Sequence, residues 1–84
     1  MENVTENQID YRKIVTAIMK ANLKIAVDHK KGPANFVRVP ISLLALFPDR
    51  EIAGIPVHDD SDLHGTIIVG RIDNDFIAEE KITI

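Results

Sequence analysis

The sequence predicts an α+β fold: an N-terminal amphipathic helix, a β-hairpin, a short buried helix and then a three-stranded antiparallel meander. Apolar residues near the start recur at spacings of three and four, as they do along one face of a helix. Isoleucine and valine together account for 20 residues, against five leucines, and most of them lie beyond residue 24. Because β-branched side chains suit strands, most of the remaining chain is expected to form sheet.

Length and composition indicate one small domain over residues 1–84. Cysteine is absent, which excludes disulfides and thiolate metal sites. A chain this short buries only about 60% of the surface that its unfolded form exposes, and small domains often gain stability from a partner subunit. We therefore expect the protein to self-associate, most simply as a homodimer.

The first helix is expected over residues 5–22. Thr5 and Gln8 stand where a capping box places its two side chains, each of which bonds the backbone N–H of the other residue. The apolar face of this helix is expected to consist of Tyr11, Ile14, Val15, Ile18 and Met19, with Asn22 as a polar exception.

Residues 23–28 alternate between apolar and polar side chains, which predicts a strand. Residues 29–33 contain Gly-Pro and predict a turn, and residues 35–39 predict a second strand that completes a hairpin. Residues 41–47 then predict a short buried helix, because proline is tolerated at a helix start and Pro40 precedes this segment.

The meander is expected to use three strands after residue 50. Residues 51–57 contain Pro56, which cannot donate to a ladder and favours an edge strand or a bulge. Residues 66–72 are apolar on both faces and predict a central strand, and residues 73–75 predict a turn. The last strand follows from residue 76, with a helix over residues 75–81 as the competing interpretation.

The segment from residue 57 to 65 gathers two histidines and three aspartates between two apolar runs. The pattern is typical of an exposed acidic hairpin loop, and we expect Asp59, Asp60, Asp62 and His64 to contact a protein partner. Imidazole and carboxylate groups also suit divalent metals, so an alternative is a metal-dependent protein that uses His58, Asp60, Asp62 and His64. The sequence has neither an EF-hand loop nor a helical zinc motif.

A second alternative is a regulator that binds nucleic acid through the first helix. Net charge is −3, which disfavours general affinity for nucleic acid, but the first 38 residues hold seven basic and four acidic side chains. The basic residues that could follow a phosphate backbone are Arg12, Lys13, Lys20, Lys24, Lys30 and Lys31.

Enzyme motifs find little support in this sequence. Ser61 lacks the glycines of a nucleophile elbow, and the four glycines are too dispersed to form a phosphate-binding loop. We expect no cofactor. The apolar runs are too short to span a bilayer and the first residues do not resemble a signal peptide, so we expect a cytoplasmic protein without a membrane partner.

The run Gly54–Val57, the acidic loop after it and the run Gly65–Gly70 together resemble a pattern in small phage and prophage proteins. The resemblance implies a phage accessory protein and brings no active site with it. The sequence as a whole favours a small, non-enzymatic protein-interaction module that self-associates and binds through its sheet edge or its acidic loop.

Overall fold

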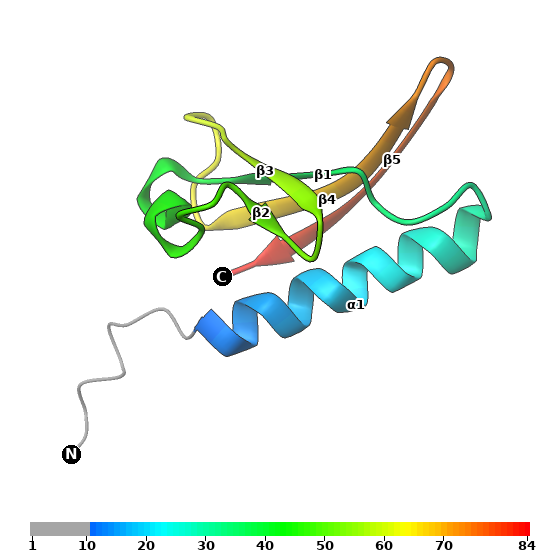
Figure 1. Cartoon of the computed structure of the whole chain (residues 1–84). Coiled ribbons are helices and arrows are strands. Elements are labelled where there is room, and N and C mark those ends of the chain that lie inside the picture. The colour runs from blue at the N-terminus through cyan, green and yellow to red at the C-terminus, as the bar shows by residue number, and fades with distance from the viewer. Residues whose placement is uncertain (1–10) are drawn as a thin grey trace.

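The computed structural model describes residues 11–84, in which one helix packs against one face of a five-stranded sheet (Figure 1). The mixed α+β class predicted from the sequence is confirmed, whereas the predicted capping box at Thr5–Gln8 lies outside the described residues. The elements, in chain order, are α1 (Tyr11–His29), β1 (Phe36–Val39), the 3-10 helix η2 (Ile41–Leu46), β2 (Glu51–Ile52), β3 (Ile55–Asp59), β4 (Thr66–Asp73) and β5 (Phe76–Thr83).

Helix α1 continues to His29, so the predicted strand over residues 23–28 is wrong, and so is the predicted hairpin that it opened. The buried stripe of α1 runs from Ile14 through Ile18 and Ala21 to Ile25, at helical spacings of three and four. Leu23 and Val27, which produced the apparent two-residue alternation, are both exposed. Among the described residues, no helix is long and apolar enough to cross a lipid bilayer.

The segment after α1 turns sharply and returns the chain to the sheet. Lys30 has a φ of 56° and its N–H donates to the Ala26 carbonyl, which ends the helix. Asn22, the polar exception on the apolar face, accepts a hydrogen bond from the Ala34 N–H at 2.7 Å through its side-chain oxygen. This polar side chain therefore fixes the loop that leads into β1.

The sheet has the order β2-β3-β1-β4-β5, so the predicted three-stranded meander is wrong. Strand β1 lies between β3 and β4, parallel to β3 and antiparallel to β4. Val37 and Val39 are completely buried, which explains why β1 takes the central position. The segment between β3 and β4 must therefore pass the end of β1 and does not close a hairpin.

The predicted single strand over residues 51–57 is a tight hairpin in the structure. Ile52 of β2 pairs with Ile55 of β3, and the two residues between them, Ala53 and Gly54, have φ values of 52° and 80°. Positive φ at both central residues is the signature of a type I′ turn, which matches the twist of antiparallel strands. Of the two strands of this hairpin, the short β2 lies at the sheet edge, and β3, with Pro56, lies inside the sheet.

The predicted short helix forms at Ile41–Leu46 as a 3-10 helix, but it is only partly buried. Leu43 faces the core, whereas Ile41, Ser42 and Ala45 are exposed. The segment from residue 76 is strand β5, as predicted, and the competing helix over residues 75–81 is wrong.

The hydrophobic core lies between α1 and the sheet (Figure 1). Strand side chains that face α1 include Val37, Val57, Ile67 and Val69, all of which belong to the core cluster. Residues of opposite parity point to the other side of the sheet, which we call the open face. Ile68 is buried on this open face and is not part of the core cluster.

Candidate functional site

A shallow depression of about 400 Å³ lies on the open face of the sheet. Four strands contribute to it, because the order of the sheet places β3, β1, β4 and β5 side by side. We call its lining residues the open-face patch: Phe36, Arg38, His58, Ile72, Ile77 and Glu79. These residues are distant in the sequence, and only the topology of the sheet gathers them.

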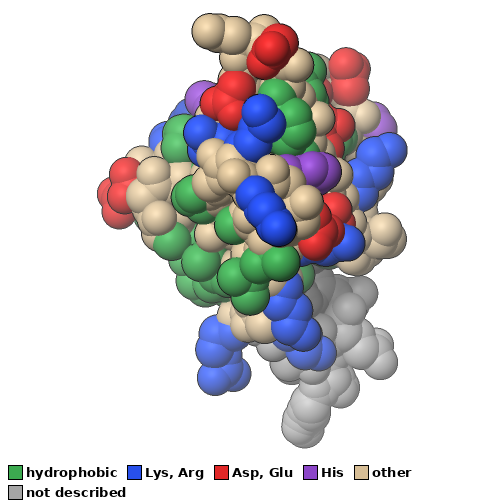
Figure 2. All heavy atoms as spheres, turned by 90° about the vertical axis from the view of Figure 1, so that its right-hand side faces the viewer, with side chains coloured by type: hydrophobic (Ala, Val, Ile, Leu, Met, Phe, Trp, Pro, Cys, Tyr) green, Lys and Arg blue, Asp and Glu red, His purple; other side chains and the backbone are tan. Residues whose placement is uncertain are grey.

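The apolar part of the open-face patch centres on Ile72 and Ile77. They are directly opposite one another in the β4–β5 ladder and are 52% and 63% exposed. Both flank the turn of the hairpin that extends from the body of the molecule (Figure 1). On the face of the molecule shown in Figure 2, hydrophobic side chains lie among charged ones. A pair of exposed isoleucines on adjacent strands offers apolar area to a partner.

Phe36 forms the floor of the patch and depends on a glycine for its position. Phe36 pairs with Gly70 on the neighbouring strand, and a β-carbon added at Gly70 would lie 2.4 Å from the Phe36 ring atom Cζ. Gly70 does not have a positive φ, so glycine is required here for space and not for backbone conformation. The ring therefore occupies the space that a side chain at residue 70 would fill.

Arg38 supplies the charge of the patch and connects it to the acidic loop. Its Nη2 donates to Glu79 Oε2 at 2.8 Å, and its Nη1 lies 3.4 Å from Asp60 Oδ2. The guanidinium carbon also lies 5.5 Å from the centre of the Phe36 ring, within the range of a cation–π contact. Arg38 Nε is buried and has no hydrogen-bond partner among the described residues. Both acids engage the guanidinium of Arg38, so the arginine is held within the chain and the patch offers mainly shape and apolar area.

The residues predicted to bind a partner do not converge. Asp59 belongs to β3, where it pairs with Val39, and only Asp60 onward forms the loop. Asp60 is turned inward, since one oxygen approaches Arg38 and the other accepts the Asp62 N–H at 2.9 Å. His64 lies in a separate depression of about 230 Å³ beside Pro40. Partner binding by this loop stays a prediction.

The alternative metal site, His58, Asp60, Asp62 and His64, is not assembled in the structure. Among residues 11–84, no group of three or more His, Asp or Glu side chains stands where it could hold one ion. His58 lies on the open face beside Phe36 and Arg38, whereas His64 lines the other depression. The two imidazoles therefore belong to different surfaces.

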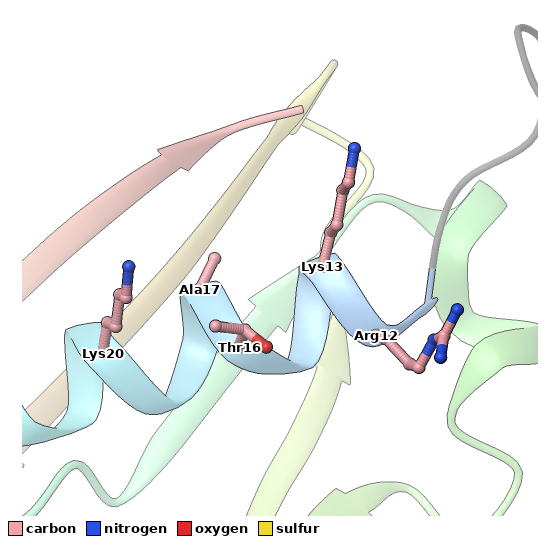
Figure 3. A pocket seen from close by; sticks show the side chains of 5 residues that line it. All are labelled: Arg12, Lys13, Thr16, Ala17 and Lys20. Carbon is pink, nitrogen blue, oxygen red and sulfur yellow. The ribbon is translucent and has the colours of Figure 1, made fainter.

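The basic residues also divide between different environments. Arg12, Lys13 and Lys20 line a depression of about 500 Å³ along α1, together with Thr16 and Ala17 (Figure 3). Lys24 instead forms an ion pair with Asp28 at 3.2 Å and approaches Glu80 at 4.0 Å. The hydrogen bond that Lys24 donates to Asp28, and then the charges of Asp28 and Glu80, raise the pKa of Lys24 above its usual 10.5.

The remaining lysines, Lys30 and Lys31, follow the end of α1. Lys31 Nζ lies 5.0 Å from the centre of the Phe76 ring, which His29 also contacts at 5.3 Å. Lys31 is therefore held near the β4–β5 hairpin, away from the depression that Lys13 and Lys20 line. The six predicted basic residues do not form one continuous stripe.

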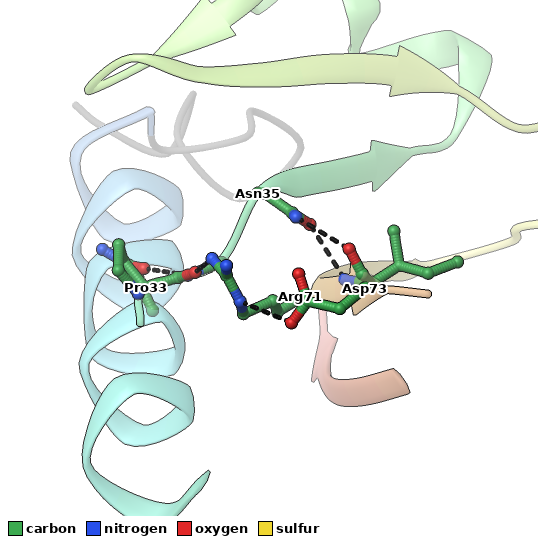
Figure 4. Close-up of polar contacts among 7 residues, drawn as sticks. Pro33, Asn35, Arg71 and Asp73 are labelled. Carbon is green, nitrogen blue, oxygen red and sulfur yellow. Dashed lines mark hydrogen bonds and ion pairs between the residues drawn. The ribbon is translucent and has the colours of Figure 1, made fainter. Parts of the chain in front are cut away.

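A polar network that the sequence analysis missed anchors the hairpin to the loop before β1 (Figure 4). Arg71 donates to the Pro33 carbonyl at 2.9 Å and to Asp73 Oδ2 at 3.0 Å. The Asn35 side chain donates to the Ile72 carbonyl and accepts a hydrogen bond from the Ile72 N–H. Its amide group therefore bonds Ile72 in the way that the backbone of a neighbouring strand would. This network holds Ile72 in place within the patch.

No protein-family model, curated protein or solved structure matches this chain. The geometry of the described residues is therefore the basis for a functional proposal. The sequence carried one signal for the open-face patch, namely that Phe36 and Arg38 alternate with the buried Val37 and Val39. An aromatic residue on the side of the strand that faces away from the core indicates apolar area on that side.

Proposed function

We propose that this chain is a small protein-interaction module that self-associates and that uses the open-face patch to bind a further protein. The observation that carries the proposal is the cross-strand pair of Ile72 and Ile77, which are both more than half exposed beside the Phe36 ring. Binding surfaces of proteins combine aromatic and apolar residues with arginine, and their energy is concentrated in a few such side chains.

The charges around the patch support a protein ligand. Arg38 is paired with both Glu79 and Asp60, so its guanidinium is engaged within the chain and is not left to select an anionic ligand. Interfaces of this kind gain affinity from apolar burial, and the surrounding ion pairs give orientation. The contribution of the acidic loop then comes through Asp60, which positions the arginine. The role as a phage accessory protein that the resemblance implies stays a prediction.

A selection from a random peptide library displayed on phage tests the patch, followed by mapping the selected peptide on the isotope-labelled chain by NMR. We expect the amide shifts to change around Phe36, Ile72 and Ile77. Ile72→Ser should weaken binding by about tenfold or more, as expected for loss of a central apolar contact. Leu23→Ser is the matched control, because Leu23 is 64% exposed on α1 and outside the patch. Peptides that bind elsewhere, or binding that Ile72→Ser leaves intact, would refute the proposal.

A second candidate function is nucleic-acid binding by α1, which the depression lined by Arg12, Lys13 and Lys20 favours (Figure 3). Binding through lysine and arginine releases counterions, so affinity for a duplex must fall steeply as salt rises. Lys20→Glu should then weaken a mobility shift, whereas Glu79→Gln on the open face should not. The absence of a shift at low salt would dismiss this candidate.

A further inference from the structure

The outer edge of β5 is the longer of the two edges of the sheet. β5 lies at one end of the strand order and spans eight residues, whereas β2 at the other end spans two. Among residues 11–84, no strand pairs with the outer side of β5. Such an edge presents a row of N–H and C=O groups that another strand can bind, unless charges or distortions block it.

The register of the β4–β5 hairpin shows which backbone groups face outward. Bonded positions alternate along an antiparallel pair. The Ile84 N–H donates to the Gly65 carbonyl at 2.8 Å, so these two residues form a hydrogen-bonded pair. The next hydrogen-bonded pair lies two residues further along each strand and consists of Ile82 and Ile67. Even-numbered residues of β5 therefore bond β4. The backbone groups that point away from the sheet belong to Ile77, Glu79, Lys81 and Thr83.

The far side of β4 supports this assignment independently. The Gly70 carbonyl accepts the Asn35 N–H, and the N–H and carbonyl of Ile72 both bond the Asn35 side chain. Even-numbered residues of β4 therefore bond toward β1, which leaves its odd-numbered residues to bond β5. Since odd residues of β4 pair with even residues of β5, both observations give the same outward set.

We propose that β5 pairs, antiparallel, with β5 of a second copy around a two-fold axis at Glu80, so that two sheets join into one of ten strands. The inference rests on the proposed function and names a second copy as the partner of the sheet edge. In this register Glu79 lies opposite Lys81 of the second copy, and the same pair recurs across the axis. Ile77 lies opposite Thr83, and the bonded pairs use the outward backbone groups of both copies.

The charged side chains of β5 favour the register with its axis at Glu80 over the registers with the axis at Glu79 or Lys81. Shifting the axis to Glu79 places Glu79 opposite its own counterpart, and shifting it to Lys81 places two lysines opposite each other. Opposite charges on directly facing residues stabilise a strand pair, and like charges destabilise it. The proposed register also places Glu80 opposite Glu80 of the second copy, but it gains two Glu79–Lys81 pairs, whereas each shifted register has a like-charge pair and no attractive one. The balance of charges on the edge therefore favours the register with its axis at Glu80.

The pairing also extends an alternation of charge that already crosses the open face. Asp60, Arg38 and Glu79 form a row in which the arginine lies between two acids. This row ends at the free edge with the Glu79 carboxylate, and Lys81 of the second copy would continue it. On the other face Glu80 meets its counterpart at the axis, where Lys24 of each copy approaches its own Glu80 at 4.0 Å.

Apolar side chains on the helix side of the sheet fit the same register. Ile84 is 45% exposed and would lie opposite Phe76 of the second copy, at a non-hydrogen-bonded position where side chains are closest. A depression of about 240 Å³ adjoins Ile84 and is lined mainly by Ile14, Ala17 and Ile82. Phe76 of the second copy would therefore reach an apolar depression that the single chain leaves open.

Sedimentation equilibrium on the full chain and two charge-reversal variants tests the pairing. We expect the native chain to be a dimer and Lys81→Glu and Glu79→Lys each to weaken it by at least about tenfold, because each variant places like charges opposite at both positions. An equimolar mixture of the two variants should dimerise again, because opposite charges then face each other. Lys20→Glu is the control for a reversed lysine outside the edge, and Glu79→Gln isolates the loss of the Arg38 ion pair.

Cysteine substitution reports the register directly, because the native chain has no cysteine. Under mild oxidation Glu80→Cys should form a disulfide between two copies, whereas Ile77→Cys should not, since its counterpart lies roughly 20 Å away along the strands. A native chain that is monomeric at high concentration overturns the inference. A dimer that Lys81→Glu leaves intact, or that links through Ile77→Cys, also overturns it. None of these three results decides whether peptides bind the open-face patch, which the Ile72 variant tests separately.

Discussion

Replacement of Gly70 by alanine tests how the centre of the open face is built. An added β-carbon would lie 2.4 Å from Phe36 Cζ and 2.7 Å from the Ala78 carbonyl oxygen, both well inside van der Waals contact. The phenylalanine ring can rotate or lift, but the Ala78 oxygen is backbone and moves only if β5 shifts relative to β4. The substitution therefore forces a displacement of the strand pair that carries Ile72 and Ile77.

Two opposing effects set the magnitude. Alanine reduces the entropy of the unfolded chain and gains about 0.4–1 kcal/mol over glycine where the native backbone tolerates it. Overpacking costs about 1–3 kcal/mol, and a backbone contact favours the upper part of that range. We expect Gly70→Ala to lower the free energy of unfolding by about 2 kcal/mol, which for a domain of this size lowers the melting midpoint by roughly 8–16 °C.

Urea unfolding followed by circular dichroism measures this loss of free energy of unfolding. A double-mutant cycle with Phe36→Ala separates the part due to the Phe36 ring from the part due to the Ala78 carbonyl. Removing the ring relieves one of the two close contacts, so Gly70→Ala should cost about 1 kcal/mol less in the Phe36→Ala background. The Ala78 contact persists in both backgrounds and should keep the cost above zero. A Gly70→Ala protein as stable as the native chain would show that the strand pair yields freely and that the close packing argued for the patch is wrong.

Three further outcomes are expected. Asn35→Ala removes both bonds to the Ile72 backbone and should cost about 1–2 kcal/mol, with faster hydrogen exchange at the Ile72 amide; unchanged exchange would contradict the anchoring role. Asp28→Asn should lower the raised pKa of Lys24 toward 10.5 in an NMR titration. Glu80→Gln should lower that pKa less, because the hydrogen bond and charge of Asp28 raise it more than the charge of Glu80 does. A larger decrease in Glu80→Gln than in Asp28→Asn would contradict this order. Because that pKa is raised, its contribution to stability is present at neutral pH and is lost only as pH rises through the folded value. Addition of Zn²⁺ or Mn²⁺ should leave the melting midpoint unchanged, since His58 and His64 lie on different surfaces, and a higher midpoint would indicate an assembled site.

Local patterns in the sequence identified most strands correctly but misassigned the end of the helix. The turn residues 73–75 and the alternation after them predicted β5, and the structure confirms that strand. Residues 23–28 also alternate, yet they are helical because Ile25 continues the buried stripe of Ile18 and Ala21. In the helix, Leu23 and Val27 lie on one exposed side and Ile25 lies nearly opposite them in the buried stripe. An alternation over only six residues is too short to distinguish a strand from a continued helix, and packing against the sheet decides between them.

Strand neighbours were the part of the fold that the sequence could not supply. The alternation at residues 36–39 predicts a strand with two faces, but nothing local indicates that β1 inserts between β3 and β4. The open-face patch was missed for the same reason, since its members are spread over four strands and form no cluster in the sequence. The histidines and aspartates of residues 58–64 are adjacent in the chain, but adjacency along an extended chain does not bring side chains together.

The insertion of β1 links the fold to the proposed interactions. Had β3 and β4 formed a hairpin, the acidic loop would have closed that hairpin and Arg38 would have stood on a different strand pair. With β1 between them, Arg38 lies near both Asp60, at the end of β3, and Glu79, on β5. The charges of the loop are thereby carried across the sheet to its free edge. A change at Asp60 should therefore alter the pairing of β5, although β1 and β4 lie between β3 and β5. The arginine that Asp60 releases would bind Glu79 more tightly, and this would weaken the attraction of Glu79 for Lys81 of a second copy.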